Sequence, residues 1–381
     1  MKAQIVVRWI ILITVLAVFA AVTGYLLRSS DHPLLDVSTE LLSMKQFDAE
    51  QKYRYQWQTD QSLLLFRSNL KAGNALPERI WDVLRWNMKS GLFDHLTPLE
   101  KRFNESYVYG QFGPYPLISP NEQWVVWTAR NQYIAATLDG KSSVRLPNEA
   151  LDEIHFTSDS LHLIDLVEEE APEKPNTFPY YCITHVNLLH LENPASHDVR
   201  QLASPSPLRL TRSNPLDVGG IPWVKYSEKA ISADNFLYCY GEFEDSRFPV
   251  SNPGETVVNI YHLDLTKQGA ITGQTAIKFP QGSWMSEMPF SNDGKRIAFW
   301  VREENASALQ ELIQRFYPAY QVQKRERTYL IVCRIDGSER HTIGYQEQEG
   351  DPESVYDLRW LPGDRALSFL YRDALWKVPT D

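Results

Sequence analysis

The sequence predicts an all-β fold in which one small unit of antiparallel strands is repeated. A short polar turn returns six times, each time followed by a run of alternating or continuous apolar residues. The steps Asp139-Gly140 and Asp336-Gly337 favour tight hairpins, because both turn residues tolerate a positive φ. Aromatic residues make up 12% of the chain, which is typical of strand-rich proteins. Together these observations predict a six-bladed β-propeller.

The repeated turns precede apolar strands throughout the chain. They are Thr59–Ser62 before LLLF, Ser119–Glu122 before WVVW, Thr157–Ser160 before LHLIDL, Ser232–Asn235 before FLYCY, Ser291–Gly294 before RIAFW, and Leu361–Asp364 before ALSFLY. Most intervals exceed the roughly 40–45 residues of an undecorated blade, so most blades carry insertions. The longest interval has room for a seventh blade near residues 208–226. We prefer six, because that stretch is rich in Pro and Gly and lacks a clear apolar run.

An uncharged segment near the N-terminus predicts a membrane anchor. Residues 9–27, WIILITVLAVFAAVTGYLL, are about as long as a helix needs to be to cross a bilayer. Lys2 and Arg8 precede the segment and favour a cytoplasmic N-terminus, with the rest of the chain extracytoplasmic, either periplasmic or extracellular. A cleaved secretory signal is the alternative interpretation. In both cases the folded domain is exported.

The predicted organisation has four parts. Residues 1–8 form a cytoplasmic tip, 9–27 a transmembrane signal-anchor helix, 28–48 a tether, and 49–381 the propeller. The last blade supplies only three strands before the chain ends, and an open sheet edge is a template for aggregation. We therefore expect a segment between about Leu34 and Phe47 to provide the missing outer strand.

The repeats resemble those of the TolB-like, WD-repeat-like propeller family. The family repeat runs S-P-D-G-K, then I-A-F, then a hairpin with Asp-Gly, and residues 291–299, SNDGKRIAF, match it closely. Ser119-Pro120 and Leu138-Asp139-Gly140 match it in the second blade. The resemblance covers about residues 50–381. It implies the fold and says little of function, since the family includes binding modules, peptidase gates and a few lyases and hydrolases.

Charge and cysteine content exclude some functions. The net charge of -10 would repel a phosphate backbone, so nucleic acid is not an expected partner. The chain has three cysteines, and a number this small and odd does not form a disulfide framework. All three, Cys182, Cys239 and Cys333, fall in predicted strands, where we expect buried thiols that are not brought together.

Insertions predict a binding rim. Residues 168–179, 244–255 and about 302–327 lie between the second and third strands of their blades, and residues 204–226 connect two blades. All four connections reach the same rim, where growth does not disturb the packing between blades. The third insertion contains a helix-like segment, Ala306–Phe316, with Asn305 as a candidate N-cap. Two interpretations stay open: a lid or partner helix over the rim, or a helix that packs its apolar stripe on the propeller edge. We predict a protein partner at this rim and at the mouth of the central channel, with aromatic contacts from Trp223, Tyr226, Phe248 and Phe316.

No catalytic or metal-binding residues are predicted. Five histidines fall in the third blade, but their spacing places neighbours on opposite faces of the sheet. The run Glu168–Glu170 is best interpreted as a solvated loop. No nucleophile elbow and no phosphate-binding glycine loop is present, so no cofactor is expected. A binding or scaffold module is the preferred function. The alternatives are a lyase or hydrolase acting on carbohydrate or peptide in the central channel, and a structural domain of an envelope complex.

Overall fold

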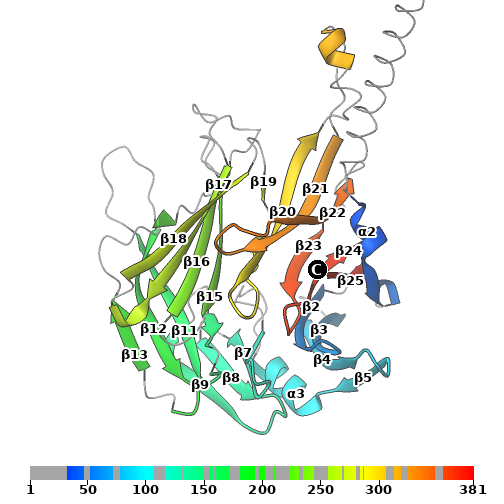
Figure 1. Ribbon diagram of the computed structural model, residues 1–381. Coiled ribbons are helices and arrows are strands. Elements are labelled where there is room, and N and C mark those ends of the chain that lie inside the picture. Colours follow the sequence, from blue (N-terminus) through cyan, green and yellow to red (C-terminus); the bar gives the residue numbers. More distant parts are fainter. Residues whose placement is uncertain are drawn as a thin grey trace, which may run out of the picture.

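Antiparallel strands dominate the computed structural model, in agreement with the predicted all-β class (Figure 1). The structure describes residues 32–46, 52–71, 78–106, 116–129, 132–149, 154–157, 159–170, 181–193, 197–201, 209–210, 223–230, 235–243, 256–267, 270–279, 284–285, 287–305, 313–318, 325–347 and 355–381. Within these ranges the strands form six sheets. In each sheet, strands that follow one another in sequence pair as a meander; the exceptions are β14, which pairs with β12, and β1, which pairs with β25.

The first three sheets follow one another along the chain. The first contains β2 (Lys52–Thr59), β3 (Ser62–Lys71), β4 (Glu78–Asn87) and β5 (Leu92–His95). The second contains β6 (Leu117–Ile118), β7 (Trp124–Ala129), β8 (Gln132–Thr137) and β9 (Ser143–Glu149). The third contains β10 (Ile154–Phe156), β11 (His162–Glu170), β12 (Tyr181–His190) and β13 (His197–Gln201), and β14 (Arg209–Leu210) also pairs with β12.

The remaining sheets complete the fold. The fourth contains β15 (Trp223–Ala230), β16 (Asn235–Phe243), β17 (Thr256–Asp264) and β18 (Ala270–Phe279). The fifth contains β19 (Trp284–Met285), β20 (Arg296–Asn305), β21 (Arg325–Arg334) and β22 (His341–Glu347). The sixth contains β23 (Tyr356–Trp360), β24 (Ala366–Tyr371), β25 (Ala374–Pro379) and β1 (Thr39–Ser43). The described helices are α2 (Leu34–Val37), α3 (Thr97–Ser106) and a single turn at 313–316. Two 3-10 turns cover Met44–Gln46 and Leu265–Lys267.

Each sheet packs against the next one, and the last packs against the first. Shared apolar clusters join the first sheet to the second, the second to the third, the fourth to the fifth, and the fifth to the sixth. Strand β10 contacts β15 between the third and fourth sheets. A further cluster joins the sixth sheet to the first, with Leu370 and Leu375 packed among Tyr55, Trp57 and Leu65. This cycle of contacts is the arrangement of a β-propeller.

The N-terminal segment supplies the outer strand of the sixth sheet. Strand β1 pairs antiparallel with β25, with Thr39 opposite Lys377 and Ser43 opposite Ala374. It lies inside the interval for which the sequence predicts a fourth strand. Leu42 is 6% exposed and joins the cluster between the sixth and first sheets. The edge of β25, which would otherwise be open, is therefore covered.

Polar contacts also hold the junction between the sixth and first sheets. The Tyr55 hydroxyl donates to the Asp357 carbonyl at 2.8 Å, and Trp57 Nε1 donates to Ser368 Oγ at 2.7 Å. The Arg359 guanidinium lies 4.9 Å from the centre of the Tyr55 ring. Burial is the main cause that raises the pKa of the Tyr55 hydroxyl, so this hydroxyl is neutral and able to donate at ordinary pH.

Residues 32–46 are packed on the sheets over much of the predicted tether. Leu34 is fully buried in the cluster between the fifth and sixth sheets, and Met44 is 5% exposed. The Tyr345 amide donates to the His32 carbonyl at 2.9 Å. A Cβ at Gly344 would lie 3.0 Å from that carbonyl, so glycine lets the two segments approach closely. The chain is thus fixed to the body from His32 onward.

The predicted anchor at residues 9–27 lies outside the described residues. Within the described ranges, no helix combines the length and the apolar character needed to cross a bilayer.

Several boundaries differ from the sequence predictions. Glu168–Glu170 is not a loop: it ends β11 and pairs with residues 181–183 of β12. The stretch 204–226 is not only a connection, because it contains β14 and the start of β15. Of the predicted helix over 306–316, the structure describes one helical turn at 313–316, while Asn305 is the last residue of β20.

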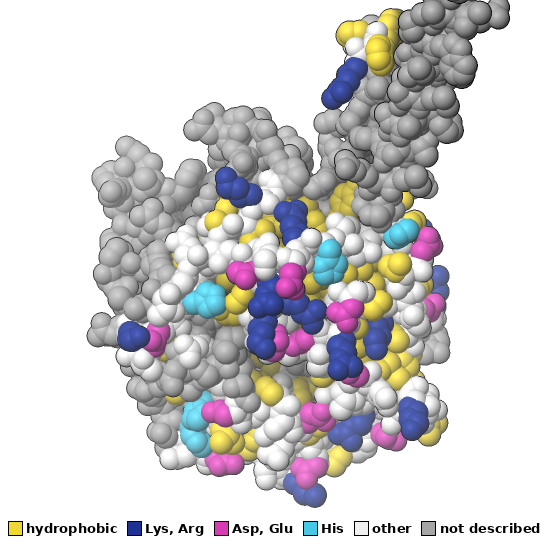
Figure 2. All heavy atoms as spheres, in the orientation of Figure 1, with side chains coloured by type: hydrophobic (Ala, Val, Ile, Leu, Met, Phe, Trp, Pro, Cys, Tyr) yellow, Lys and Arg dark blue, Asp and Glu magenta, His cyan; other side chains and the backbone are white. Residues whose placement is uncertain are grey.

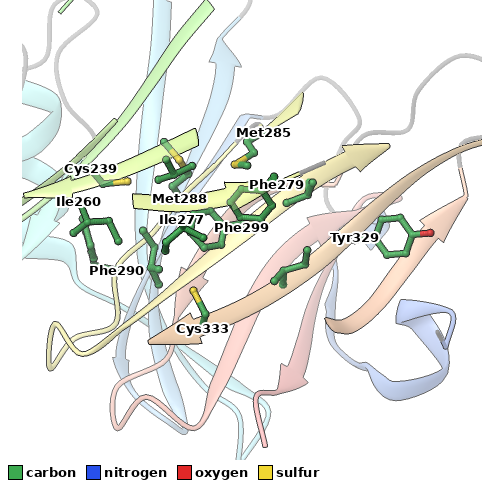
Figure 3. Close-up of a cluster of buried hydrophobic side chains, with 14 of the residues drawn as sticks. Cys239, Ile260, Ile277, Phe279, Met285, Met288, Phe290, Phe299, Tyr329 and Cys333 are labelled. Atoms are coloured by element: carbon green, nitrogen blue, oxygen red, sulfur yellow. The ribbon is translucent and has the colours of Figure 1, made fainter. Parts of the chain in front are cut away.

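Two of the three cysteines lie in one apolar cluster. Cys239 of β16 and Cys333 of β21 lie in the same apolar cluster between the fourth and fifth sheets (Figure 3). Both are free and buried. Burial raises the pKa of Cys333 to about 12, so this thiol is neutral at physiological pH. Both thiols contribute to one shared core, because facing strands of adjacent sheets meet there, and they form no disulfide.

Candidate functional site

Three of the four predicted contact residues lie in described elements. Trp223 and Tyr226 are part of β15, opposite Phe243 and Tyr240 of β16. Phe248 lies outside the described residues. Phe316 ends the helical turn in the insertion between β20 and β21, and 83% of its surface is exposed. The structure does not bring Phe316 together with β15 in any described contact.

The insertion between β20 and β21 presents neighbouring aromatic side chains to solvent. Tyr317 follows Phe316 and is 63% exposed, and its amide donates to the Ile313 carbonyl at 2.7 Å. Figure 1 shows β20 and β21 reaching beyond the other sheets, with the helical turn at their far end. In Figure 2 the same turn shows apolar and basic side chains standing away from the body. Isolated large apolar groups are common on surfaces, but two adjacent aromatics are a candidate anchor for a partner.

The rim opposite the insertions, the tight-turn rim, is built from the repeated polar turns. Four of these turns share two backbone hydrogen bonds. In the turn that starts at Ser291, the amide of the fourth residue, Gly294, donates to the Ser291 carbonyl, and the Ser291 amide donates to the carbonyl of the sixth residue, Arg296. The first of these bonds measures 2.9–3.0 Å in all four turns. The fourth residues all have positive φ: Glu122 at 59°, Ser160 at 63°, Gly294 at 67° and Asp364 at 57°. Only one of them is glycine, so the tight turns tolerate a left-handed residue that also offers a functional side chain.

Side chains within the turns explain why their sequence is polar. In three turns the first residue, Ser119, Thr157 or Ser291, donates its hydroxyl to an oxygen of the third residue at 2.6–2.7 Å. The third residue also accepts the backbone amide two positions further on, as Asp293 does from Lys295 at 3.0 Å. These local bonds satisfy the chain where it reverses direction.

The fourth position of the turn links neighbouring sheets. The Asp364 carboxylate accepts the amides of Asn292 and Asp293 at 2.7 and 2.8 Å, and also Asn292 Nδ2 at 2.8 Å. Ser160 Oγ accepts the Asn121 amide at 2.9 Å. In each case a turn of one sheet holds the turn of the preceding sheet. Glu122 occupies the equivalent position in the second sheet, yet its carboxylate has no hydrogen bond to a described residue.

A cavity of about 350 Å³ lies at this tight-turn rim. Its wall contains residues of the first strands of three sheets, β2, β6 and β10, together with turn residues of the second, fifth and sixth sheets. It is therefore located where the inner strands converge, at the end of the molecule away from the long insertions. The sequence analysis placed a site on the insertion rim and at the channel mouth, and it did not single out the residues of this cavity.

Two polar groups in the cavity wall stand out. Gln58 is 6% exposed, and its Oε1 accepts Arg85 Nε at 3.0 Å. Burial raises the pKa of the Glu122 carboxyl, and the charge of Arg85 offsets only part of that rise. Among the described residues, the wall includes the carboxylate of Glu122 and the imidazole of His155, and it includes neither Lys nor Arg.

No catalytic constellation emerges in the described residues. His162 and His190 are cross-strand partners whose rings meet edge to face at 4.7 Å, and His162 Nδ1 lies 2.8 Å from Asp159 Oδ2. In the described ranges no group of three or more His, Cys, Asp or Glu side chains is arranged to hold a metal ion.

No family model and no curated protein matches this chain. Its fold is similar to that of several solved β-propellers. An oligogalacturonate lyase in complex with manganese is 11% identical with a TM-score of 0.45, covering 90% of this chain and 92% of the other. A putative TolB from Agrobacterium tumefaciens is 12% identical with a TM-score of 0.38, covering 76% of each chain. An acylaminoacyl peptidase from Pyrococcus horikoshii is 11% identical with a TM-score of 0.39, covering 86% of this chain and 44% of the peptidase.

The link made by Asp364 can be tested by stability measurements. Asp364→Ala leaves the amides of Asn292 and Asp293 without their acceptor and places alanine at positive φ, so we expect the free energy of unfolding to fall by about 3 kcal/mol. Asp364→Asn keeps one oxygen and tolerates this backbone conformation, and it should lose clearly less. Urea unfolding of both variants gives the comparison. Equal losses would show that the carboxylate does not hold the two turns together.

Proposed function

We propose that this chain is a membrane-anchored, extracytoplasmic β-propeller of six blades that binds a protein partner through its insertion-bearing rim. The observation that carries the proposal is the exposed pair Phe316 and Tyr317 at the far end of β20 and β21. Aromatic side chains provide large contact area at low entropic cost, and they are enriched among the residues that dominate binding energy. The six described sheets, each packed on the next, support the six-bladed architecture.

The exit of the N-terminal segment supports a partner close to the membrane. The His32 carbonyl accepts a hydrogen bond from the Tyr345 amide of β22. Tyr345 pairs with Tyr329, which lies near the start of β21. Strand β21 begins directly after the insertion that carries Phe316. The chain therefore reaches the body beside the insertion rim. With residues 9–27 as the anchor, this rim faces the bilayer, and a partner that contacts Phe316 and Tyr317 is expected at the membrane surface.

Membrane anchoring predicts a specific fractionation result. The full chain should stay with the membrane pellet after alkaline carbonate extraction, because about 19 apolar residues form an integral anchor. A variant without residues 1–31 should appear in the soluble fraction when made inside the cell. Release of the full chain by carbonate, or an intact mass showing removal of the first residues, would contradict the anchor.

Partner binding predicts a local effect of the exposed aromatics. The double variant Phe316→Ala, Tyr317→Ala should reduce partner crosslinking in native membranes by about tenfold or more, the usual effect of losing dominant interface residues. Its melting temperature should not change, because both side chains are exposed.

Leu92→Ala is a matched control for this test. Leu92 is 64% exposed and begins β5 on the tight-turn rim. This variant should crosslink like the wild-type chain. Unchanged crosslinking in the double variant would remove the tip of β20 and β21 from the interface. In the chain without residues 1–31, loss of binding to protein-free vesicles in the double variant would assign the aromatics to lipid instead.

A further inference from the structure

The innermost strand of the sixth sheet contains a β-bulge. In the pairing of β23 with β24, two residues of β23, Asp357 and Leu358, lie opposite a single residue of β24. Asp357 has a φ of 58°, a left-handed conformation that is uncommon for residues other than glycine. Bulges and left-handed residues occur often at functional sites, where they redirect a side chain. This bulge therefore marks a candidate binding position.

The two neighbouring sheets hold the bulge in place. Glu287 lies between β19 and β20 of the fifth sheet, and its carboxylate accepts the amides of Asp357 and Leu358 at 2.8 and 2.7 Å. From the first sheet, the Tyr55 hydroxyl donates to the Asp357 carbonyl at 2.8 Å. Both backbone groups of Asp357 are thus bonded to side chains of other sheets. A backbone held in this way fixes the side chains that it carries.

Arg359 and Asp357 form an ion pair that leaves polar atoms unused. Arg359 Nε donates to Asp357 Oδ1 at 2.7 Å, and the guanidinium lies 4.9 Å from the centre of the Tyr55 ring. Among the described residues, the two terminal nitrogens of Arg359 and Oδ2 of Asp357 have no hydrogen-bond partner.

These unused atoms are accessible to solvent. The two side chains are 21% and 22% exposed. No nitrogen or oxygen of either one is among the buried, unpaired side-chain atoms of the described residues. The pair therefore offers a charged donor and a charged acceptor side by side to a ligand that arrives from the solvent.

The accessible side of the pair faces the centre of the ring. Strand β23 pairs with β24 alone, so it is the innermost strand of its sheet, and innermost strands line the central channel of a propeller. Leu358 and Trp360 pack in the cluster shared with the fifth sheet, and Arg359 lies over Tyr55 of the first. Since both flanks of β23 are covered, solvent reaches the pair from the channel. The strand ends at a tight turn, so it begins towards the insertion rim, where Tyr356 is 50% exposed.

The two charges select the chemistry of the ligand. The terminal nitrogens of a guanidinium match the two oxygens of a carboxylate. A ligand with a carboxylate alone would also meet the negative charge of Asp357 beside Arg359. An ammonium group next to the carboxylate converts that repulsion into attraction. A free α-amino acid carries both groups on one carbon atom and, like the ion pair, has no net charge.

We infer that the central channel contains a binding site for a free α-amino acid, whose carboxylate binds Arg359 and whose ammonium group binds Asp357. The bulge positions both side chains. The site uses neither Phe316 nor Tyr317, so it does not depend on the protein partner proposed for the insertion rim.

Ligand-observed NMR on the full-length chain in detergent tests this site. The probes are alanine and phenylalanine, together with the analogues of each that lack the ammonium group (propanoate, 3-phenylpropanoate) or the carboxylate (ethylamine, 2-phenylethylamine). At least one of the amino acids should bind, and its two analogues should bind at least about tenfold more weakly. No binding by either amino acid, or equal binding by an analogue, would overturn the inference.

Two variants locate the binding. Arg359→Lys keeps the positive charge but loses the planar fork, and Asp357→Asn keeps an acceptor and tolerates the positive φ but loses the negative charge. Each should weaken amino-acid binding about tenfold or more. Thermal melts establish that each variant is folded. Binding by both variants that equals binding by the wild-type chain would contradict the inference.

Arg327→Lys is the matched control. Arg327 belongs to the third strand of the fifth sheet and has the same kinds of contact, an ion pair with Glu347 at 2.7 Å and a position 4.1 Å from the centre of the Tyr345 ring. This variant should bind the amino acid like the wild-type chain. A loss equal to that of Arg359→Lys would show that the effect is not specific to the channel, and would contradict the inference.

Discussion

The closure of the ring depends on one strand pairing between the two ends of the chain. The C-terminal part of the sequence supplies three strands of the sixth sheet, and without a fourth the outer edge of β25 would expose unpaired amides and carbonyls. Strand β1 covers that edge and also places Leu42 and Met44 in the apolar cluster between the sixth and first sheets. Backbone pairing and burial of apolar surface therefore act at the same place, and each makes the other more favourable.

The same pairing holds residues 32–46 against the body of the protein. Because residues 32–46 are bound to β22 and β25, His32 lies beside the rim that carries the insertions, where Phe316 is exposed. The tight-turn rim lies at the other end of the strands. There the turns are bonded to their own backbones and to neighbouring turns through Asp364 and Ser160, and this rigid frame surrounds the cavity.

The sequence predicted those features that local chemistry determines. A serine or threonine at the first position of a turn and an Asp or Asn at the third form bonds within the turn, so the repeated turns and the strands after them could be located. Helix α3 was not predicted, although Thr97-Pro98 before Leu99 and Phe103 is a helix start with an apolar spacing; it fills the space between the first two sheets. The cavity gave no signal in the sequence, because its wall forms only when β2, β6 and β10 converge.

The stability of a Leu42 variant tests ring closure most directly. Leu42 is buried at the junction of the sixth and first sheets, while Glu40 of the same strand is exposed. If β1 closes the ring, Leu42→Ala should lower the free energy of unfolding by about 2–4 kcal/mol, whereas Glu40→Ala should change it by less than about 0.5 kcal/mol. Urea unfolding in detergent measures both values. A Leu42→Ala variant as stable as Glu40→Ala would show that β1 does not complete the propeller.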